Sequence, residues 1–101
     1  MFKITQQKGF QITFNNGYTV SVQFGSGNYC DNYNLSVMEY YDKPVPPSST
    51  AETALIDPSG NFVEYKGDDV QARQTPQDVI ELMIYADNLP QYDGAAVIGK
   101  D

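Results

Sequence analysis

The sequence contains no histidine and only one cysteine among its 101 residues. Without histidine, the chain lacks the usual general base, the common serine–histidine and cysteine–histidine nucleophile pairs and the commonest zinc ligand. The single cysteine, Cys30, excludes an intrachain disulfide and a cysteine metal cluster. Neither a Walker loop nor a dinucleotide-binding fingerprint is present. The sequence therefore predicts a protein that is not an enzyme and that holds no metal or cofactor.

Long apolar runs are also missing. No segment approaches the roughly 20 apolar residues that a membrane-spanning helix requires. Residues 1–8 contain no apolar core like that of a signal peptide. We therefore expect no association with a membrane and a cytoplasmic location.

Basic residues are few, with six lysines and arginines against thirteen aspartates and glutamates, a net charge of −7. The charge is unevenly distributed, because residues 1–30 contain Lys3 and Lys8 but no acidic residue. An acidic protein repels the phosphates of nucleic acids, so direct binding of DNA or RNA is disfavoured. A protein partner with a basic surface is favoured instead.

The first 24 residues alternate apolar and polar side chains in three segments, 2–5, 10–14 and 18–24. This period of two is typical of strands with one buried face. A three-residue turn at residues 15–17 (Asn-Asn-Gly) would pair Ile12 with Val20 and place every apolar residue on one face. A two-residue turn would mix the two faces, so the pattern favours the three-residue turn.

A second turn, predicted at residues 7–9 (Gln-Lys-Gly), would pair Ile4 with Ile12 and Phe2 with Phe14. The three segments then form an antiparallel meander. The side of the meander away from its apolar residues would carry Thr5, Gln11, Thr13, Thr19, Ser21 and Gln23. This polar and nearly uncharged face is either exposed to solvent or packed against another subunit or a partner.

Residues 35–41 are predicted to form a fourth strand. Residues 52–56 and 62–65 should form a second hairpin, because Pro58 and Gly60 suit the turn between them. The remaining connections contain many glycine, proline, asparagine and serine residues and are predicted to be loops.

A helix is predicted from Thr75 to about Asn88. Thr75 is suited to the N-cap, Pro76 to the first helical position, and Asp78 completes a capping box. Apolar residues recur at helical spacing on one side of this segment. The predicted fold class is α+β, with an antiparallel meander, a second hairpin, about 5–6 strands and one C-terminal helix packed on the sheet. Residues 1–101 are interpreted as one domain, with 91–101 as a loose tail or a short strand through 95–98.

Tyrosine is abundant, with eight residues, and several tyrosines lie in polar segments. Tyrosine combines apolar area with a hydroxyl group and is enriched at interfaces. One interpretation is that these side chains only cover a small core. The other is an acidic, aromatic contact surface for a partner, made of Tyr29, Asp31, Tyr33, Glu39, Tyr40, Tyr41 and Asp42.

A glycine-rich segment follows the third predicted strand. Backbone amides in such segments can bind phosphate, so a candidate ligand loop consists of Gly25, Ser26, Gly27 and Asn28. The alternative is a plain loop, because neither a helix nor a lysine follows. Cys30 has no basic neighbour to lower its pKa and is interpreted as a packed thiol.

Three segments resemble small uncharacterised proteins of bacteriophages: residues 9–31, beginning Gly-Phe-Gln-Ile-Thr-Phe-Asn-Asn-Gly, residues 57–62 (Asp-Pro-Ser-Gly-Asn-Phe) and residues 75–82 (Thr-Pro-Gln-Asp-Val-Ile-Glu-Leu). The resemblance implies a phage or prophage origin, and hence a location in the host cytoplasm. It assigns no activity and no site residue. By analogy, small acidic phage proteins are often accessory factors that disable a host or defence component.

Three functions stay open at this stage. The first is a non-enzymatic binding protein, such as a phage inhibitor of a host or defence protein, that contacts its partner through the acidic, tyrosine-rich surface. The second is a binder or sponge for a small ligand such as a nucleotide, using residues 25–34. The third is a structural protein that forms homo-oligomers through the uncharged sheet face or a free edge strand.

Overall fold

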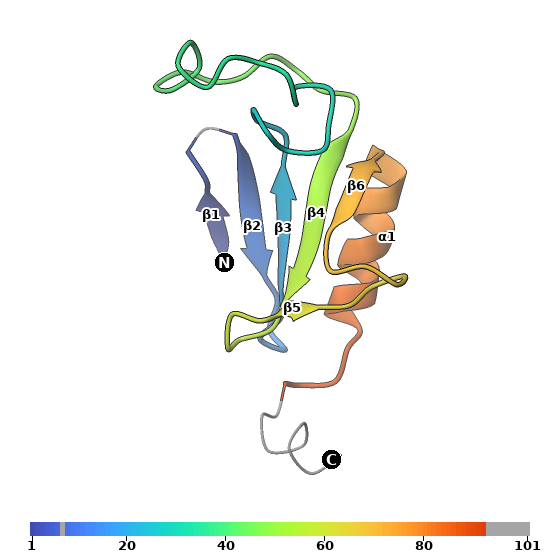
Figure 1. Cartoon of the computed structure of the whole chain (residues 1–101). Coiled ribbons are helices and arrows are strands. Elements are labelled where there is room, and N and C mark those ends of the chain that lie inside the picture. Colours follow the sequence, from blue (N-terminus) through green and yellow to red (C-terminus); the bar gives the residue numbers. More distant parts are fainter. Residues whose placement is uncertain (7, 93–101) are drawn as a thin grey trace.

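A computed structural model describes residues 1–6 and 8–92, and these residues form one sheet and one helix (Figure 1). The elements in chain order are β1 (Phe2–Ile4), β2 (Gly9–Thr13), β3 (Thr19–Gln23), β4 (Ala51–Ile56), β5 (Phe62–Val63), β6 (Gln71–Gln74) and α1 (Pro76–Asp87). The predicted α+β fold, with six antiparallel strands and a C-terminal helix on the sheet, is confirmed. The strand predicted through residues 95–98 lies outside the described residues.

The strands follow one another across the sheet in the order β1-β2-β3-β4, and every pairing is antiparallel. Beyond β4 the sheet divides. β5 pairs with one end of β4, where Ile56 lies opposite Phe62, and β6 pairs with the other end, where Ala51 lies opposite Gln74. The first three strands thus form the predicted meander, and β4 lies beside β3 as the fourth strand of the sheet.

The register between β2 and β3 is as predicted. Ile12 lies opposite Val20 and Phe10 opposite Val22, and Gly17 has the positive φ of 95° that the end of the three-residue turn requires. The second hairpin and its turn are also confirmed, with Gly60 at a φ of 88°.

The predicted register between β1 and β2 is wrong by two residues, because Ile4 lies opposite Phe10 rather than Ile12. Gly9 does not belong to the turn. It lies in β2 opposite Gln23, so close to the carbonyl oxygen of Val22 that a side chain there would overlap it. The amide of Thr5 closes the wider connection by donating to Gly9 O at 3.0 Å. A shift of two residues leaves every side chain on its predicted face.

The fourth strand predicted at residues 35–41 is also wrong. These residues form turns, in which the amide of Tyr40 donates to the carbonyl oxygen of Ser36 at 3.2 Å. The place beside β3 is taken by β4, where Leu55 lies opposite Val20. Residues 35–41 are therefore not the fourth strand of the sheet.

Helix α1 begins as the sequence predicts. Thr75 is the N-cap, its hydroxyl accepts from the amide of Asp78 at 3.2 Å, and the Asp78 carboxylate accepts from the amide of Thr75 at 2.9 Å. The hydrogen bond from the Thr75 amide is the main cause that lowers the pKa of Asp78. The helix ends at Asn88, as predicted.

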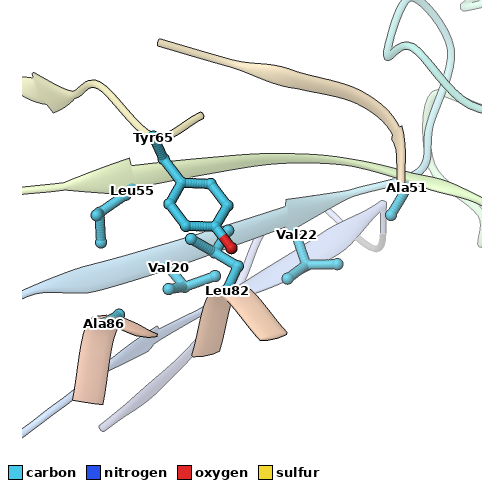
Figure 2. Packing of buried hydrophobic residues seen from close by; sticks show 7 residues of the cluster. All are labelled: Val20, Val22, Ala51, Leu55, Tyr65, Leu82 and Ala86. Carbon is cyan, nitrogen blue, oxygen red and sulfur yellow. The ribbon is translucent and has the colours of Figure 1, made fainter. Parts of the chain in front are cut away.

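The core lies between α1 and the central strands (Figure 2). Figure 2 shows the side chains of the sheet and of the helix converging there: Val20, Val22, Ala51, Leu55, Tyr65, Leu82 and Ala86. Helix α1 contacts β3, β4 and β6. Within residues 1–6 and 8–92, no helix has the length and apolar character needed to cross a membrane.

Candidate functional site

Every candidate site residue predicted from the sequence lies in one connection, residues 24–50, between β3 and β4. We call this connection the long loop. Figure 1 shows it extending past the ends of the strands and turning back toward β4. A connection of this length without strands or helices is uncommon in a compact domain and is usually functional or disordered. The hydrogen bonds at its base decide between these two possibilities.

The first anchor of the long loop is Asn32, whose side chain is buried. Its amide nitrogen Nδ2 donates to the carbonyl oxygen of Phe24 at 2.8 Å and to that of Pro46 at 2.9 Å. One side chain therefore ties the first residue of the loop to a residue near its end.

The second anchor is Asp31. Its carboxylate accepts hydrogen bonds from the hydroxyl of Ser49 at 2.6 Å, from the amide of Ser49 at 2.7 Å and from the hydroxyl of Thr50 at 3.2 Å. The hydrogen bonds from Ser49, that of the hydroxyl first, lower the pKa of Asp31. A residue predicted to contact a partner thus also joins two parts of the long loop.

These hydrogen bonds give the stability of the protein a dependence on pH. Because the pKa of Asp31 is lower in the folded protein, its ionised form stabilises the fold above the ordinary aspartate pKa of about 4. That contribution is lost as the pH falls through the lowered pKa. We expect Asp31→Asn to lower the melting temperature at pH 7 and to leave it unchanged near pH 2. Thermal denaturation at both pH values measures this, with Asp42→Asn, an exposed carboxylate of the same loop, as the control.

The third anchor comes from two strands outside the long loop. In β4, the Glu52 carboxylate accepts from Asn28 Nδ2 at 3.2 Å and from the amide of Tyr29 at 3.1 Å. In β6, the amide of Arg73 donates to Tyr29 O at 2.8 Å, and its Nη1 donates to the carbonyl oxygen of Cys30 at 3.3 Å. The sequence reasoning missed both Glu52 and Arg73 as site residues. No local pattern could have identified them, because their partners lie 23 and 43 residues away.

The anchored part of the long loop presents two tyrosines. The rings of Tyr29 and Tyr33 stack with their centroids 5.5 Å apart and their planes 6° apart. Both residues remain accessible to solvent, since Tyr29 is 48% exposed and Tyr33 is 41% exposed. Stacking fixes the two rings relative to each other, so they offer a rigid aromatic surface to solvent. We call these two residues the tyrosine pair.

The outer part of the long loop carries the other predicted contact residues. The ammonium of Lys43 lies 5.0 Å from the ring centroid of Tyr40, while Tyr41, Glu39 and Asp42 are exposed. Tyr41 also borders a hollow of about 350 Å³ together with Val37, Gln6 and Lys8. The structure thus describes the predicted contact surface as two groups, the tyrosine pair at the base and this outer group.

The candidate ligand loop uses three of its backbone amides in hydrogen bonds within the long loop. Gly25 N donates to Asn28 Oδ1 at 2.9 Å, Gly27 N donates to Tyr33 O at 3.0 Å, and Asn28 N donates to Gly25 O at 3.2 Å. A phosphate-binding loop needs amides that point to the ligand. Here these three amides shape the long loop and support the tyrosine pair.

Cys30 is buried between the anchors of the long loop. The amide of Asn32 donates to its sulfur Sγ at 3.4 Å, which lies 3.8 Å from the carbonyl oxygen of Gly25. Across residues 1–6 and 8–92, the structure places no three side chains of the kinds that bind metals close enough to hold an ion.

The comparisons with known proteins found no matching family model, no matching curated protein and no matching solved structure.

Proposed function

We propose that this chain is a non-enzymatic binding protein that contacts a protein partner through the tyrosine pair and the acidic residues of the long loop. The observation that supports the proposal most directly is the stacked and exposed tyrosine pair on a loop with three hydrogen-bonded anchors. Tyrosines are common among the residues that dominate binding energy at interfaces. Their contribution is largest where binding does not have to order them first.

The anchors make the tyrosine pair ready for binding. A flexible loop would lose conformational freedom when a partner fixes it, at a cost of about 0.5–1.5 kcal/mol for each immobilised side chain. Asn32, Glu52 and Arg73 already fix the backbone around Tyr29 and Tyr33 in the free protein. The binding energy of the two rings is then available for affinity.

The charge of the chain suggests the kind of partner. A net charge of −7 attracts basic surfaces and repels acidic ones over distances of about a Debye length. Glu39 and Asp42 are exposed in the same loop as the tyrosine pair. We therefore propose a partner with a basic surface. The resemblance to bacteriophage proteins extends the proposal, by analogy, to an inhibitor of a host or defence protein in the host cytoplasm.

Affinity capture from a bacterial lysate tests the proposal when variants are compared with the wild type. The double variant Tyr29→Ser/Tyr33→Ser should bind the captured protein at least about 30-fold more weakly. Phe62→Ser is the matched control, because Phe62 is an exposed aromatic residue of β5, outside the long loop, and it should leave the affinity unchanged. Affinity of the purified pair, measured at low and high salt, should fall as salt rises.

Two results would contradict parts of this proposal. If the double variant binds with wild-type affinity, the tyrosine pair is not the contact. If binding is independent of salt, the basic character of the partner is wrong even if the tyrosines matter.

Nucleotide binding at residues 25–34 has less support. Three amides of the candidate ligand loop, those of Gly25, Gly27 and Asn28, donate within the long loop and not to a ligand. Arg73 is basic and close, but it donates to the carbonyl oxygens of Tyr29 and Cys30. If the chain bound nucleotides, adding them would raise its melting temperature, and this rise is the measurement that would support nucleotide binding.

A further inference from the structure

The apolar side of the sheet is only partly covered by helix α1. Along each pairing, Phe2 lies opposite Ile12, Ile4 opposite Phe10, and Phe10 opposite the core residue Val22, so all of them are on the side of the helix. Yet α1 contacts β3, β4 and β6, and Figure 1 shows β1 at the opposite edge of the sheet. We call Phe2, Ile4, Phe10 and Ile12 the apolar shelf. Phe2 is 73% exposed and Ile4 is 78% exposed.

The helix has a second apolar side, which does not face its own core. Leu82 and Ala86 fill the core, whereas Ile80 is 49% exposed and Ile84 is 58% exposed. We call Ile80 and Ile84, together with Met83, which borders this side and also packs against the core, the helix flank. A soluble helix normally carries polar residues away from the core, so these isoleucines require an explanation.

A groove joins the helix flank to the apolar shelf. Ile80 and Met83 from α1 and Phe10 and Phe24 from the sheet border a mostly apolar space of about 340 Å³. The flank and the shelf are therefore two sides of one continuous apolar surface. An exposed apolar surface of this kind marks an interaction site.

The charges around the two surfaces have opposite signs. Helix α1 contains Asp78, Glu81 and Asp87 and no basic residue, and Glu81 is paired with Lys66 of the same chain at 3.5 Å. Residues 1–24, which include the shelf, contain Lys3 and Lys8 and no acidic residue. Lys3 lies opposite Gln11, so its side chain is on the polar face of the edge strand β1 and not on the shelf itself. The acidic helix of one copy therefore complements the basic N-terminal strands of another copy in charge.

We propose that two copies of this chain form a dimer with two-fold symmetry, in which the helix flank of each copy packs on the apolar shelf of the other. The two helices then lie side by side between the two sheets, and Ile80 and Ile84 of each copy enter the groove of the other. Such an isologous interface forms each contact twice. A standard interface buries about 800 Å² per partner, roughly an eighth of the chain's surface of 6508 Å².

An alternative dimer, made by pairing two β1 edges, is disfavoured. Lys3 is the central residue of β1, so centred pairing would place two lysines directly opposite each other, which is destabilising. That arrangement would also leave the helix flank exposed.

Sedimentation of the full chain at about 100 µM, well above the Kd of a typical stable dimer, tests the proposal. We expect a mass of twice 11.2 kDa. Ile4→Arg on the shelf and Ile84→Glu on the flank should each raise the dimer Kd at least about 100-fold. Both residues are exposed in the single chain, so circular dichroism should show unchanged folding. Met38→Ser, at an exposed apolar residue of the long loop, should leave the dimer intact.

Mixing the two variants distinguishes this dimer from any other. In the mixed pair, one flank and one shelf are both unaltered, and at the second contact the introduced arginine faces the introduced glutamate. An equimolar mixture should therefore recover a dimer that neither variant forms alone. A wild-type monomer, a dimer that tolerates both substitutions, or a mixture that stays monomeric would each overturn the proposal.

Discussion

Replacing Asn16 with alanine is expected to lower the free energy of unfolding by about 2–4 kcal/mol, although Asn16 lies in a turn. Its side chain is buried, and Nδ2 donates to the carbonyl oxygen of Ala86 at 2.7 Å and to that of Leu89 at 3.0 Å. Its Oδ1 accepts from the amide of Tyr18 at 3.1 Å. The turn between β2 and β3 thus caps the end of α1.

The residues at the end of the helix satisfy only part of its last turn, where Asn88 Nδ2 donates to Ile84 O at 2.9 Å. The last carbonyl groups of a helix have no partner within it, and they carry a partial negative charge. The last turn of α1 contains no basic residue. Asn16 supplies the missing donor. In Asn16→Ala, Leu89 O and Ala86 O both lose this donor, and Ala86 O keeps hydrogen bonds from the backbone amides of Asn88 and Leu89.

Urea denaturation of three variants tests the role of Asn16. Asn15→Ala, at an exposed neighbour in the same turn, should change the unfolding free energy by less than about 0.5 kcal/mol. Asn16→Asp should be more destabilising than Asn16→Ala at pH 7, because a carboxylate cannot donate and repels the carbonyl groups. Equal unfolding free energies for Asn15→Ala and Asn16→Ala would show that any loss of stability comes from altering the turn, and not from losing the hydrogen bonds between Asn16 and the end of α1.

The turn at Asn16 also shows where prediction from the sequence succeeds and where it ends. The three-residue turn and the register of β2 against β3 were predicted, because both follow from the alternation of neighbouring residues. The partner of the Asn16 side chain was not, because Ala86 lies 70 residues further along the chain. Local signals also gave the capping box of α1, where Thr75 and Asp78 are three residues apart.

Two of the failures have a common physical cause, which is tertiary context. Gly9 has the composition of a turn residue, but it is needed in β2 for the close approach of Val22 O. Residues 35–41 follow β3 in the chain, but the place beside β3 is taken by β4. β6 was missed because its four residues are polar at three positions and include Arg73 at a φ of 53°, so no alternation indicates a strand.

The residues of the candidate site were predicted from the sequence, but the contacts that hold them in place were not. Tyr29 and Tyr33 were correctly placed in one loop, because they are four residues apart. Their stacking depends on residues that the sequence did not indicate, including Glu52 and Arg73 from two different strands. Asp31 was predicted to contact a partner, and the structure adds its hydrogen bonds to Ser49 and Thr50.

A second large loss of stability is expected when Asn32 is replaced, because this residue connects the two ends of the long loop. Asn32→Ala removes the donor to Phe24 O and Pro46 O, both of which accept at less than 3 Å. Leaving two partly buried carbonyl groups without this donor should lower the unfolding free energy by about 2–3 kcal/mol. Asn34→Ala, at an exposed asparagine of the same loop, is the matched control.

The larger consequence of Asn32→Ala should be local. A loop that has lost its central anchor opens more often than the sheet unfolds, so amide hydrogen exchange should accelerate in residues 24–50 and much less in α1. Because the tyrosine pair would then have to be ordered on binding, affinity for the captured partner should fall even though Tyr29 and Tyr33 are unchanged. If amide hydrogen exchange accelerated uniformly across the chain, Asn32 would stabilise the fold as a whole. The order of the tyrosine pair would then not depend on this anchor in particular.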